Sequence, residues 1–519
     1  LGRRVANLFC DWRLFDDHDN DLVVDTDSMY AGLAFKTGAF YLYDQGEGVT
    51  HFRYFANPVS RDALRDWLLK DPTKLSQLDN FLPLTPAFRP VATASSRGRG
   101  LSDSQPRVIF LPGIMGSYLT VEHAGRAERV WFDFFDLARG ALEKIARVDD
   151  KSIVANEIWP RFYGDLAAYL ADSHEVITCP YDWRQPIEDC ADALKSAIER
   201  AVKQNAKLPI RLLAHSMGGL VARALMVKYP SAWQAVIDSG GCLVMLGTPN
   251  NGADLMVHTL LGKTSSMRGL EKLDFKHDLQ AILDIVAGFP GALTLLPRPP
   301  HSESATPTAD YYQNTTWEEL KQRNTDRWYG DRVAAVPSQN LLAAARSFWE
   351  KVLPTNQISH PERVSYVFGQ GDKTPCGVLK TDDGRPQLQF TRQGDGSVTW
   401  ASGRLDNLPE NERCWYMPVE HADLTGDPTY FPAILDLLTT GRTQRLERLP
   451  RSRGETDQPF VLEALPPTLP GEGEMARAVF GSGAQQRKRT RKASFSVSVH
   501  AGDLRFIDLP QLLDPGDLL

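Results

Sequence analysis

The chain has 519 residues, of which 42% are hydrophobic and 24% charged, and its net charge is −7. This composition is typical of globular proteins, and the length predicts two to four domains. The acidic balance gives no indication of nucleic-acid binding, and no apolar run approaches the ~18 residues of a membrane-spanning helix. The six cysteines form no C-x-x-C pair and the histidines have no zinc spacing, so we expect no metal site and a reducing, cytoplasmic environment.

Changes in composition divide the chain into five regions. Two stretches rich in Pro, Ser, Gly and charged residues, 85–106 and 441–492, are predicted linkers. They flank a block at 107–440 that carries the strongest structural signals. A separate region at 1–84 precedes them, and the period-two alternation within 493–519 indicates a small β-containing segment.

Within the block 107–440, short apolar runs alternate with amphipathic helical patterns. The predicted strands lie at 108–111, 176–179, 210–213, 242–246, 364–368 and 414–417, and the predicted helices at 187–204, 217–228 and 431–439. Continuous apolar strands separated by helices predict a parallel α/β sheet that is covered on both faces. Ligands are then expected at the carboxyl ends of the strands.

The segment 248–361 interrupts this alternation. It contains apolar patches such as 279–283 and 289–296 but no clear strand. We interpret it as a helical cap over the site. The alternative is a long, partly disordered insertion. Long loops without secondary structure are uncommon in compact domains, and many of those that occur are disordered.

A strand-turn-helix motif carries the strongest chemical signal. The string A-H-S-M-G-G at 214–219 directly follows the predicted strand at 210–213 and opens a predicted helix. Such a nucleophile elbow presents its serine at the apex of a tight turn, so the positions two before and two after must be small. Here they are Ala214 and Gly218, and Ser216 is the predicted nucleophile.

A serine hydroxyl needs a base to take its proton, and that base is usually a histidine oriented by a carboxylate. Asp395 in the turn G-D-G-S-V and His421 after the last predicted strand follow Ser216 in the expected order. The rival base is His360, which no strand positions. The rival carboxylates, which lack a tight Gly-flanked turn after a strand, are Asp406, Asp423 and Asp427.

The tetrahedral intermediate needs backbone N–H donors that stabilise its oxyanion. Met217, the residue after the nucleophile, is one expected donor. The loop P-G-I-M-G-S at 112–117 follows the first predicted strand, and Gly113 and Gly116 let its N–H groups turn inward. Ile114 is the expected second donor, and a simple Gly-Pro turn is the alternative.

Together these motifs resemble the lecithin:cholesterol acyltransferase-like family of α/β-hydrolases, over about residues 105–440. The resemblance rests on L-P-G-I-M-G-S at 111–117, P-Y-D-W-R at 180–184, A-H-S-M-G-G at 214–219, L-G-T-P-N-N-G-A at 246–253 and G-D-G-S-V at 394–398. It implies the α/β-hydrolase fold and a serine esterase or lipase that needs no cofactor. The implied site comprises Ser216, Asp395 and His421 as the triad, Ile114 and Met217 as the oxyanion hole, and Trp183, Gly113 and Met115 as substrate contacts.

The expected substrate is an acyl ester, with a lipid or phospholipid favoured by the resemblance. Water is the expected acyl acceptor, and transfer to an alcohol is the alternative. The alternative hypothesis belongs to a different class of function. It is a non-catalytic hydrolase-fold module that binds other domains or protein partners. The basic run at 487–492 is predicted to be a solvated linker, with contact to a membrane surface or phosphate as the alternative.

The region 1–84 contains a partial echo of the second half of the block. Asp21 in N-D-L-V-V precedes His51 by 30 residues, and Asp395 precedes His421 by 26. We therefore hypothesise that 1–84 is the C-terminal portion of a second α/β-hydrolase-like domain. The chain starts at Leu1 rather than Met and shows no signal-peptide pattern, which is compatible with a section of a longer protein.

Overall fold

The computed structural model describes residues 40–41, 82–83, 105–123, 126–131, 140, 142–274, 276–299, 309–322, 336–380, 386–449 and 459–461. Two compact units divide the chain, one formed by Leu1–Ser95 and Val497–Asp508 and the other by Ser96–Ser496 and Leu509–Leu519. In the first unit, β1 (Phe40–Tyr41) pairs antiparallel with β2 (Leu82–Pro83). The hypothesised Asp21–His51 pair and the predicted segment 493–519 lie outside the described residues.

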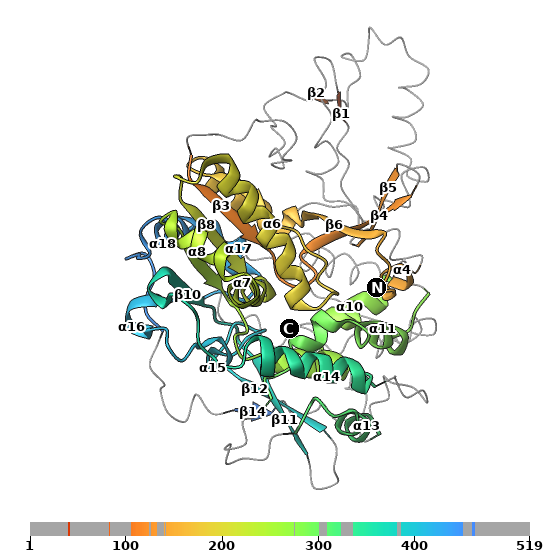
Figure 1. The fold of residues 1–519 in the computed structure, drawn as a ribbon. Coiled ribbons are helices and arrows are strands. Elements are labelled where there is room, and N and C mark those ends of the chain that lie inside the picture. Colours follow the sequence, from red (N-terminus) through yellow and green to blue (C-terminus); the bar gives the residue numbers. More distant parts are fainter. Residues whose placement is uncertain are drawn as a thin grey trace, which may run out of the picture. The chain divides into compact units, whose positions relative to one another are not determined.

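Six parallel strands form the central sheet of the second unit (Figure 1). They are β3 (Arg107–Leu111), β7 (Glu175–Thr178), β8 (Ile210–His215), β9 (Cys242–Leu246), β10 (Val364–Phe368) and β13 (Cys414–Tyr416). These are the six predicted strands, and their order is β13-β10-β9-β8-β3-β7. The chain order reverses at β3, because β7 pairs with one side of it and β8 with the other. The loops after β3 and β8 therefore lie next to each other at the carboxyl edge of the sheet, where ligands bind in such folds.

Helices cover both faces of this sheet, as the apolar strands predicted. Alternate residues of β3 belong to different cores: Ile109 and Leu111 pack on the side of α6 (Ile187–Asn205) and α7 (Met217–Lys228), whereas Val108 and Phe110 pack on the other side. That second side is covered by α5 (Pro160–Ala171) and α18 (Phe431–Thr440). The other short helices described outside 248–361 are α4 (Leu142–Ala146), α8 (Pro230–Asp238), α15 (Trp400–Gly403), α16 (Glu410–Arg413), α17 (Asp423–Gly426), η6 (Pro361–Arg363) and η7 (Pro428–Tyr430).

A small antiparallel sheet that the sequence did not predict follows β3 directly. Its strands are β4 (Ser117–His123), β5 (Arg126–Trp131) and β6 (Ile153–Ile158), in the order β5-β4-β6. The pairing of β4 shifts register against both neighbours between Tyr118 and Thr120. Such bulges break the period-two alternation by which strands are recognised in a sequence.

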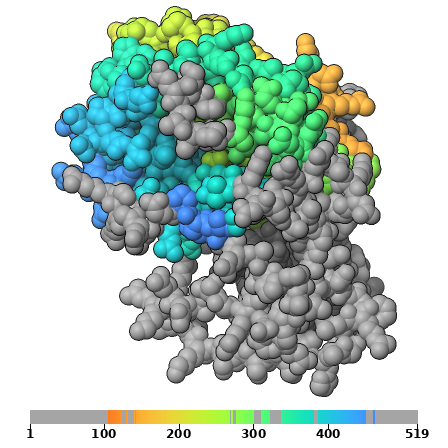
Figure 2. Space-filling model, turned by 90° about the horizontal axis from the view of Figure 1, so that it is seen from below, coloured from red at the N-terminus to blue at the C-terminus, as the bar shows by residue number. Residues whose placement is uncertain are grey.

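In its described residues, the segment 248–361 consists of helices joined by turns and loops, in agreement with the helical interpretation, and its position as a cap over the site stays a prediction. Its helices are α9 (Asp254–Leu260), α10 (Ser265–Leu273), α11 (Leu279–Val286), α12 (Pro290–Thr294), α13 (Asn314–Gln322), α14 (Gln339–Ser347) and the π-helix η5 (Phe348–Val352). Two of its large side chains, Trp317 and Trp349, are buried. Green and teal atoms of this segment adjoin the cyan and blue atoms of residues after β10 on the face shown in Figure 2.

A second antiparallel sheet shows that the domain extends beyond residue 440, where the sequence predicted that it ends. Strands β11 (Thr374–Lys380) and β12 (Pro386–Thr391) form a hairpin, and β14 (Phe460–Val461) pairs with β12. Residues 441–449 also stay on the domain: Glu447 bridges to Tyr416, and the Arg448 guanidinium donates a hydrogen bond to the Cys414 carbonyl at 2.7 Å. The predicted linker 441–492 therefore starts too early, because these contacts join residues distant in sequence.

Candidate active site

Ser216 occupies the turn between β8 and α7. Its backbone has φ 53° and ψ −125°, a strained conformation that L-residues rarely adopt. The turn is held by the Ser216 N–H, which donates to the Leu246 carbonyl at 2.9 Å. A Cβ at Gly218 would lie 2.6 Å from the Pro112 carbonyl oxygen, so a side chain there would clash with the loop after β3. The structure thus forms the strained turn that the sequence predicted around Ser216.

Asp395 and His421 meet at the same edge of the sheet. The His421 Nδ1 lies 2.7 Å from Asp395 Oδ2, and the His421 N–H donates to the Asp395 carbonyl at 2.8 Å. Asp395 is 2% exposed, and its other carboxylate oxygen accepts hydrogen bonds from the N–H groups of Ser397 and Val398. A carboxylate in this position selects the Nδ1–H tautomer of His421, which leaves Nε2 free to accept a proton.

Close approaches between loops bring this pair to the nucleophile. The His421 ring lies 4.8 Å, centroid to centroid, from the ring of His215, the residue before Ser216. A Cβ at Gly247 would lie 2.9 Å from Asp395 Oδ2 and 3.0 Å from His421 Nδ1, while one at Gly113 would lie 2.9 Å from the Ser216 Cβ. The predicted Ser, Asp and His therefore gather in one place, with glycines where the loops touch.

The rival residues lie in other contacts. His360 is partly exposed, and its Nδ1 lies 3.1 Å from a Glu362 carboxylate oxygen. Asp406 accepts a hydrogen bond from the Asn356 amide, and Asp427 caps the N–H of Thr429. Asp423 begins α17.

The loop at 112–117 makes a tight turn beside Ser216. The Gly116 N–H donates to the Gly113 carbonyl at 3.1 Å, and Met115 has φ 61° at the centre of the turn. The Trp131 indole N–H holds this strained residue by donating to the Met115 carbonyl at 3.0 Å. The Ile114 N–H has no acceptor among the described residues. The Met217 N–H is the first of α7, and the first N–H groups of a helix have no partner within it. Both expected oxyanion donors therefore remain available.

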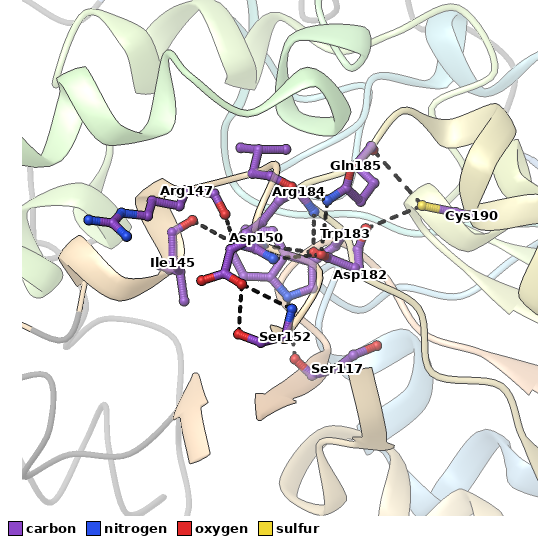
Figure 3. Close-up of polar contacts among 11 residues, drawn as sticks. Ser117, Ile145, Arg147, Asp150, Ser152, Asp182, Trp183, Arg184, Gln185 and Cys190 are labelled. Carbon is purple, nitrogen blue, oxygen red and sulfur yellow. Dashed lines mark hydrogen bonds and ion pairs between the residues drawn. The ribbon is translucent and has the colours of Figure 1, made fainter. Parts of the chain in front are cut away.

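Residues of the P-Y-D-W-R motif hydrogen-bond to this loop, and Figure 3 shows the contacts of Asp182, Trp183 and Arg184. The Tyr181 hydroxyl donates to the Pro112 carbonyl at 2.6 Å, and the Trp183 indole donates to the Ser117 carbonyl at 3.3 Å. Arg184 is fully buried, pairs with both Asp182 carboxylate oxygens and donates to the carbonyls of residues 145 and 147. The polar residues of the motif therefore join the loop after β7 to the segment before β6.

The three predicted substrate-contact residues differ in burial and in the groups that they contact. Trp183 is 3% exposed, and its ring meets the edges of Trp131 and Phe289 at 5.3 and 5.6 Å. Gly113 lies against Ser216, but its N–H donates to the Tyr163 hydroxyl at 2.9 Å. Met115 is partly exposed and packs against the main core. Contact of these residues with a substrate stays a prediction.

Sequence reasoning missed two buried residues of the site, Tyr163 and His215. The Tyr163 hydroxyl lies 3.1 Å from His215 Nδ1, and His215 Nε2 lies 3.0 Å from the His421 carbonyl oxygen. Burial lowers the pKa of His215 to about 3 and raises that of Tyr163 above its ordinary value. Tyr163 carries no local sequence signal, whereas His215 stands within the A-H-S-M-G-G string.

Among the described residues, no group of His, Cys, Asp and Glu is arranged to hold a metal ion. No helix in the described part of the chain is long and apolar enough to cross a membrane. The sheet order, the serine turn after β8 and the Asp–His pair after β10 and β13 together define an α/β-hydrolase domain.

Comparisons with known proteins agree with this class. The family model described as lecithin:cholesterol acyltransferase matches residues 139–349, and a domain of unknown function matches residues 1–69. Lecithin-cholesterol acyltransferase-like 4 of Arabidopsis thaliana is 20% identical over 409 residues, which cover 64% of this chain and 75% of the relative. The matched part of the domain is thus similar to the lecithin:cholesterol acyltransferase family, the resemblance that its motifs indicated. Ser216 lies inside the matched range, whereas Asp395 and His421 lie beyond its end.

Solved structures with similarity include the Tle4–Tli4 complex, with 16% identity, a TM-score of 0.46, and coverage of 64% of this chain and 97% of that one. The mature Bacillus licheniformis lipase BlEst2 has 13% identity, a TM-score of 0.31, and coverage of 66% and 95%. Because both TM-scores lie below 0.5, the fold assignment rests on the sheet order itself.

Proposed function

We propose that this protein is a serine hydrolase that cleaves an acyl ester through an acyl-Ser216 intermediate. The observation that carries the proposal is the 2.7 Å contact between His421 Nδ1 and the buried Asp395 carboxylate, beside the strained turn of Ser216. A buried, hydrogen-bonded carboxylate that fixes one tautomer of a histidine, next to a serine at the apex of a strained turn, is the arrangement that activates a hydroxyl.

In the proposed reaction, Ser216 Oγ attacks the ester carbonyl carbon while His421 Nε2 takes the hydroxyl proton. The carbonyl oxygen becomes an oxyanion that accepts hydrogen bonds from the N–H groups of Ile114 and Met217. The intermediate collapses, the C–O bond to the alcohol breaks, and His421 returns the proton to the departing alkoxide. Water then attacks the acyl-serine with His421 again as base, and the acid and free Ser216 are released.

A lipid or phospholipid is the proposed ester. The side chains of Ile114 and Met115 in the oxyanion loop are partly exposed, and the buried aromatic residues Trp131 and Trp183 hydrogen-bond to this loop. The apolar character of the loop favours an acyl chain. In the alternative, an alcohol takes the place of water as the acceptor of the acyl group, and the steps at Ser216 and His421 are the same. Cytoplasmic localisation, contact with a membrane surface and additional protein partners stay predictions.

Labelling with a fluorophosphonate probe tests the mechanism. We expect the chain to be labelled, and Ser216→Ala to abolish labelling, because the probe reacts only with an activated serine. An unlabelled chain, or labelling that survives Ser216→Ala, would contradict the proposal and favour a non-catalytic binding module.

Nitrophenyl esters of increasing chain length then test the substrate class. A kcat/KM that rises from acetate to decanoate is expected for a lipid substrate. Activity restricted to acetate and butyrate would overturn the lipid assignment while leaving ester hydrolysis in place. Adding a long-chain alcohol to the assay and measuring the ester product separates transfer from hydrolysis.

A further inference from the structure

The hydroxyl of Tyr163 lies at the junction of two loops of the site. It belongs to α5, on the opposite face of the sheet from α7, and its residue is 3% exposed. The Gly113 N–H donates to this hydroxyl at 2.9 Å, and the hydroxyl lies 3.1 Å from His215 Nδ1. The oxyanion loop and the nucleophile turn are thus connected through one oxygen atom.

His215 continues the connection to the third loop. Its Nε2 lies 3.0 Å from the His421 carbonyl oxygen, which can only accept, so Nε2 carries the proton. Burial lowers the pKa of His215 to about 3, so the ring is neutral near pH 7 and its Nδ1 accepts from the Tyr163 hydroxyl. Each donor in the chain from Gly113 through Tyr163 and His215 to His421 therefore has its acceptor.

The oxyanion loop is shaped around the same hydroxyl. A Cβ at Gly116 would lie 2.7 Å from the Tyr163 oxygen, closer than real Cβ contacts. The Gly113 N–H is already hydrogen-bonded to the Tyr163 hydroxyl and cannot also donate to an oxyanion. The next N–H along the turn, that of Ile114, is therefore the one available to the oxyanion. The reaction steps proposed above do not use Tyr163 or His215.

We propose that Tyr163 and His215 are positioning residues, whose hydrogen-bond chain fixes the oxyanion loop, the nucleophile turn and the triad histidine relative to one another. This inference rests on the proposed serine hydrolase function. It assigns the two residues no contact with the substrate. Their effect is on the geometry in which Ile114 N–H meets the oxyanion and His421 meets Ser216.

Tyr163→Phe removes the central oxygen and keeps the ring, which packs edge-on against Phe110 at 5.4 Å. Because misplacing catalytic groups by about 1 Å costs roughly 100-fold in rate, we expect kcat to fall by roughly 10- to 100-fold with KM within about threefold of the wild type. A trifluoromethyl ketone, which mimics the tetrahedral intermediate, should bind more weakly by the same factor as kcat/KM falls. A residue with a purely structural role would not produce this proportionality.

Tyr312→Phe is the matched control. Tyr312 is a buried cap tyrosine whose hydroxyl donates to the Leu296 and Pro297 carbonyls, outside the proposed chain. We expect a comparable loss of thermal stability with kcat within about twofold of the wild type. Equal kinetic losses in the two variants would show that any lost buried hydroxyl is sufficient, and would overturn the inference.

A second pair of variants keeps the inference testable if Tyr163→Phe does not fold. His215→Gln retains an amide that can donate to the His421 carbonyl, whereas His215→Leu retains neither partner. We expect the kcat of His215→Gln to be at least about fivefold higher than that of His215→Leu. Wild-type kcat in both variants would exclude the positioning role, while a wild-type chain that fluorophosphonate does not label would instead exclude the proposed function.

Discussion

The carboxyl edge of the parallel sheet and the helical cap are stabilised in different ways. At the edge, glycines and single hydrogen bonds hold the loops: Gly218 and Gly247 allow contacts that a Cβ would block, and Asp395 has a donor on each carboxylate oxygen. In the cap, buried aromatic and aliphatic side chains such as Trp317 and Leu283 provide the packing. Single-atom changes should therefore alter the chemistry at the edge, whereas changes in the cap should alter stability.

The largest expected effect is the separation of activity from stability at Ser216. Ser216→Gly removes the nucleophile, so kcat should fall by roughly 10⁴- to 10⁶-fold. Glycine also accepts the positive φ of 53° without strain, so the free energy of unfolding should rise by about 1 kcal/mol. Ser216→Ala is the control, because it loses activity but keeps a Cβ. Urea unfolding that shows no difference between the two variants would refute strain at this position.

The next effect tests the role of Asp395. Asp395→Asn would present an amide N–H to His421 Nδ1 and so select the wrong imidazole tautomer, and kcat should fall by about 10⁴-fold. Asp427→Asn is the matched control, since Asp427 caps a turn of a surface helix. Steady-state kinetics on a nitrophenyl ester measures both. A loss in Asp395→Asn no greater than in the control would remove Asp395 from the mechanism.

A smaller effect, on stability alone, is expected where the cap meets the β11–β12 hairpin. His258 of α9 is buried, its Nε2 donates to the Gly377 carbonyl at 3.0 Å, and burial lowers its pKa to about 4. The unfolded chain, with an ordinary histidine pKa of about 6.5, binds a proton more readily than the folded one. The stability contributed by neutral His258 is therefore complete above about pH 6.5 and is lost as pH falls toward 4.

His258→Gln keeps a donor for Gly377 but cannot be protonated. Between pH 7.5 and 5, the wild type should lose about 2 kcal/mol more unfolding free energy than this variant. Urea titrations at the two pH values measure the difference. Parallel losses in the two proteins would show that His258 is not the residue that responds to acid.

The smallest effect is expected at the surface contact between the cap and α4. Lys276 Nζ lies 2.6 Å from Glu143, and both side chains are about half exposed. Solvent and salt screen such pairs, so Lys276→Ala should lower the Tm by no more than about 2 °C, with kcat unchanged. A larger shift in thermal melting, or altered kcat, would show that this ion pair couples the cap to the site.

Local patterns determined much of this protein from the sequence alone. The six strands of the central sheet were recognisable because buried parallel strands are continuous apolar runs. Ser216, Asp395 and His421 were predicted together because each follows a strand in a chain order that the fold imposes, and the structure brings them to one edge.

Only the tertiary structure decided how those loops are held. Tyr163 belongs to a helix between motifs, and nothing local shows that its hydroxyl meets Gly113 and His215, 50 and 52 residues away. The chain beyond 440 likewise stays with the domain through pairing of Glu447 and β14 with distant strands. Periodicity and spacing predict local secondary structure, because they depend on residues close together in the sequence. These hydrogen bonds instead join groups that only the folded sheet brings within reach.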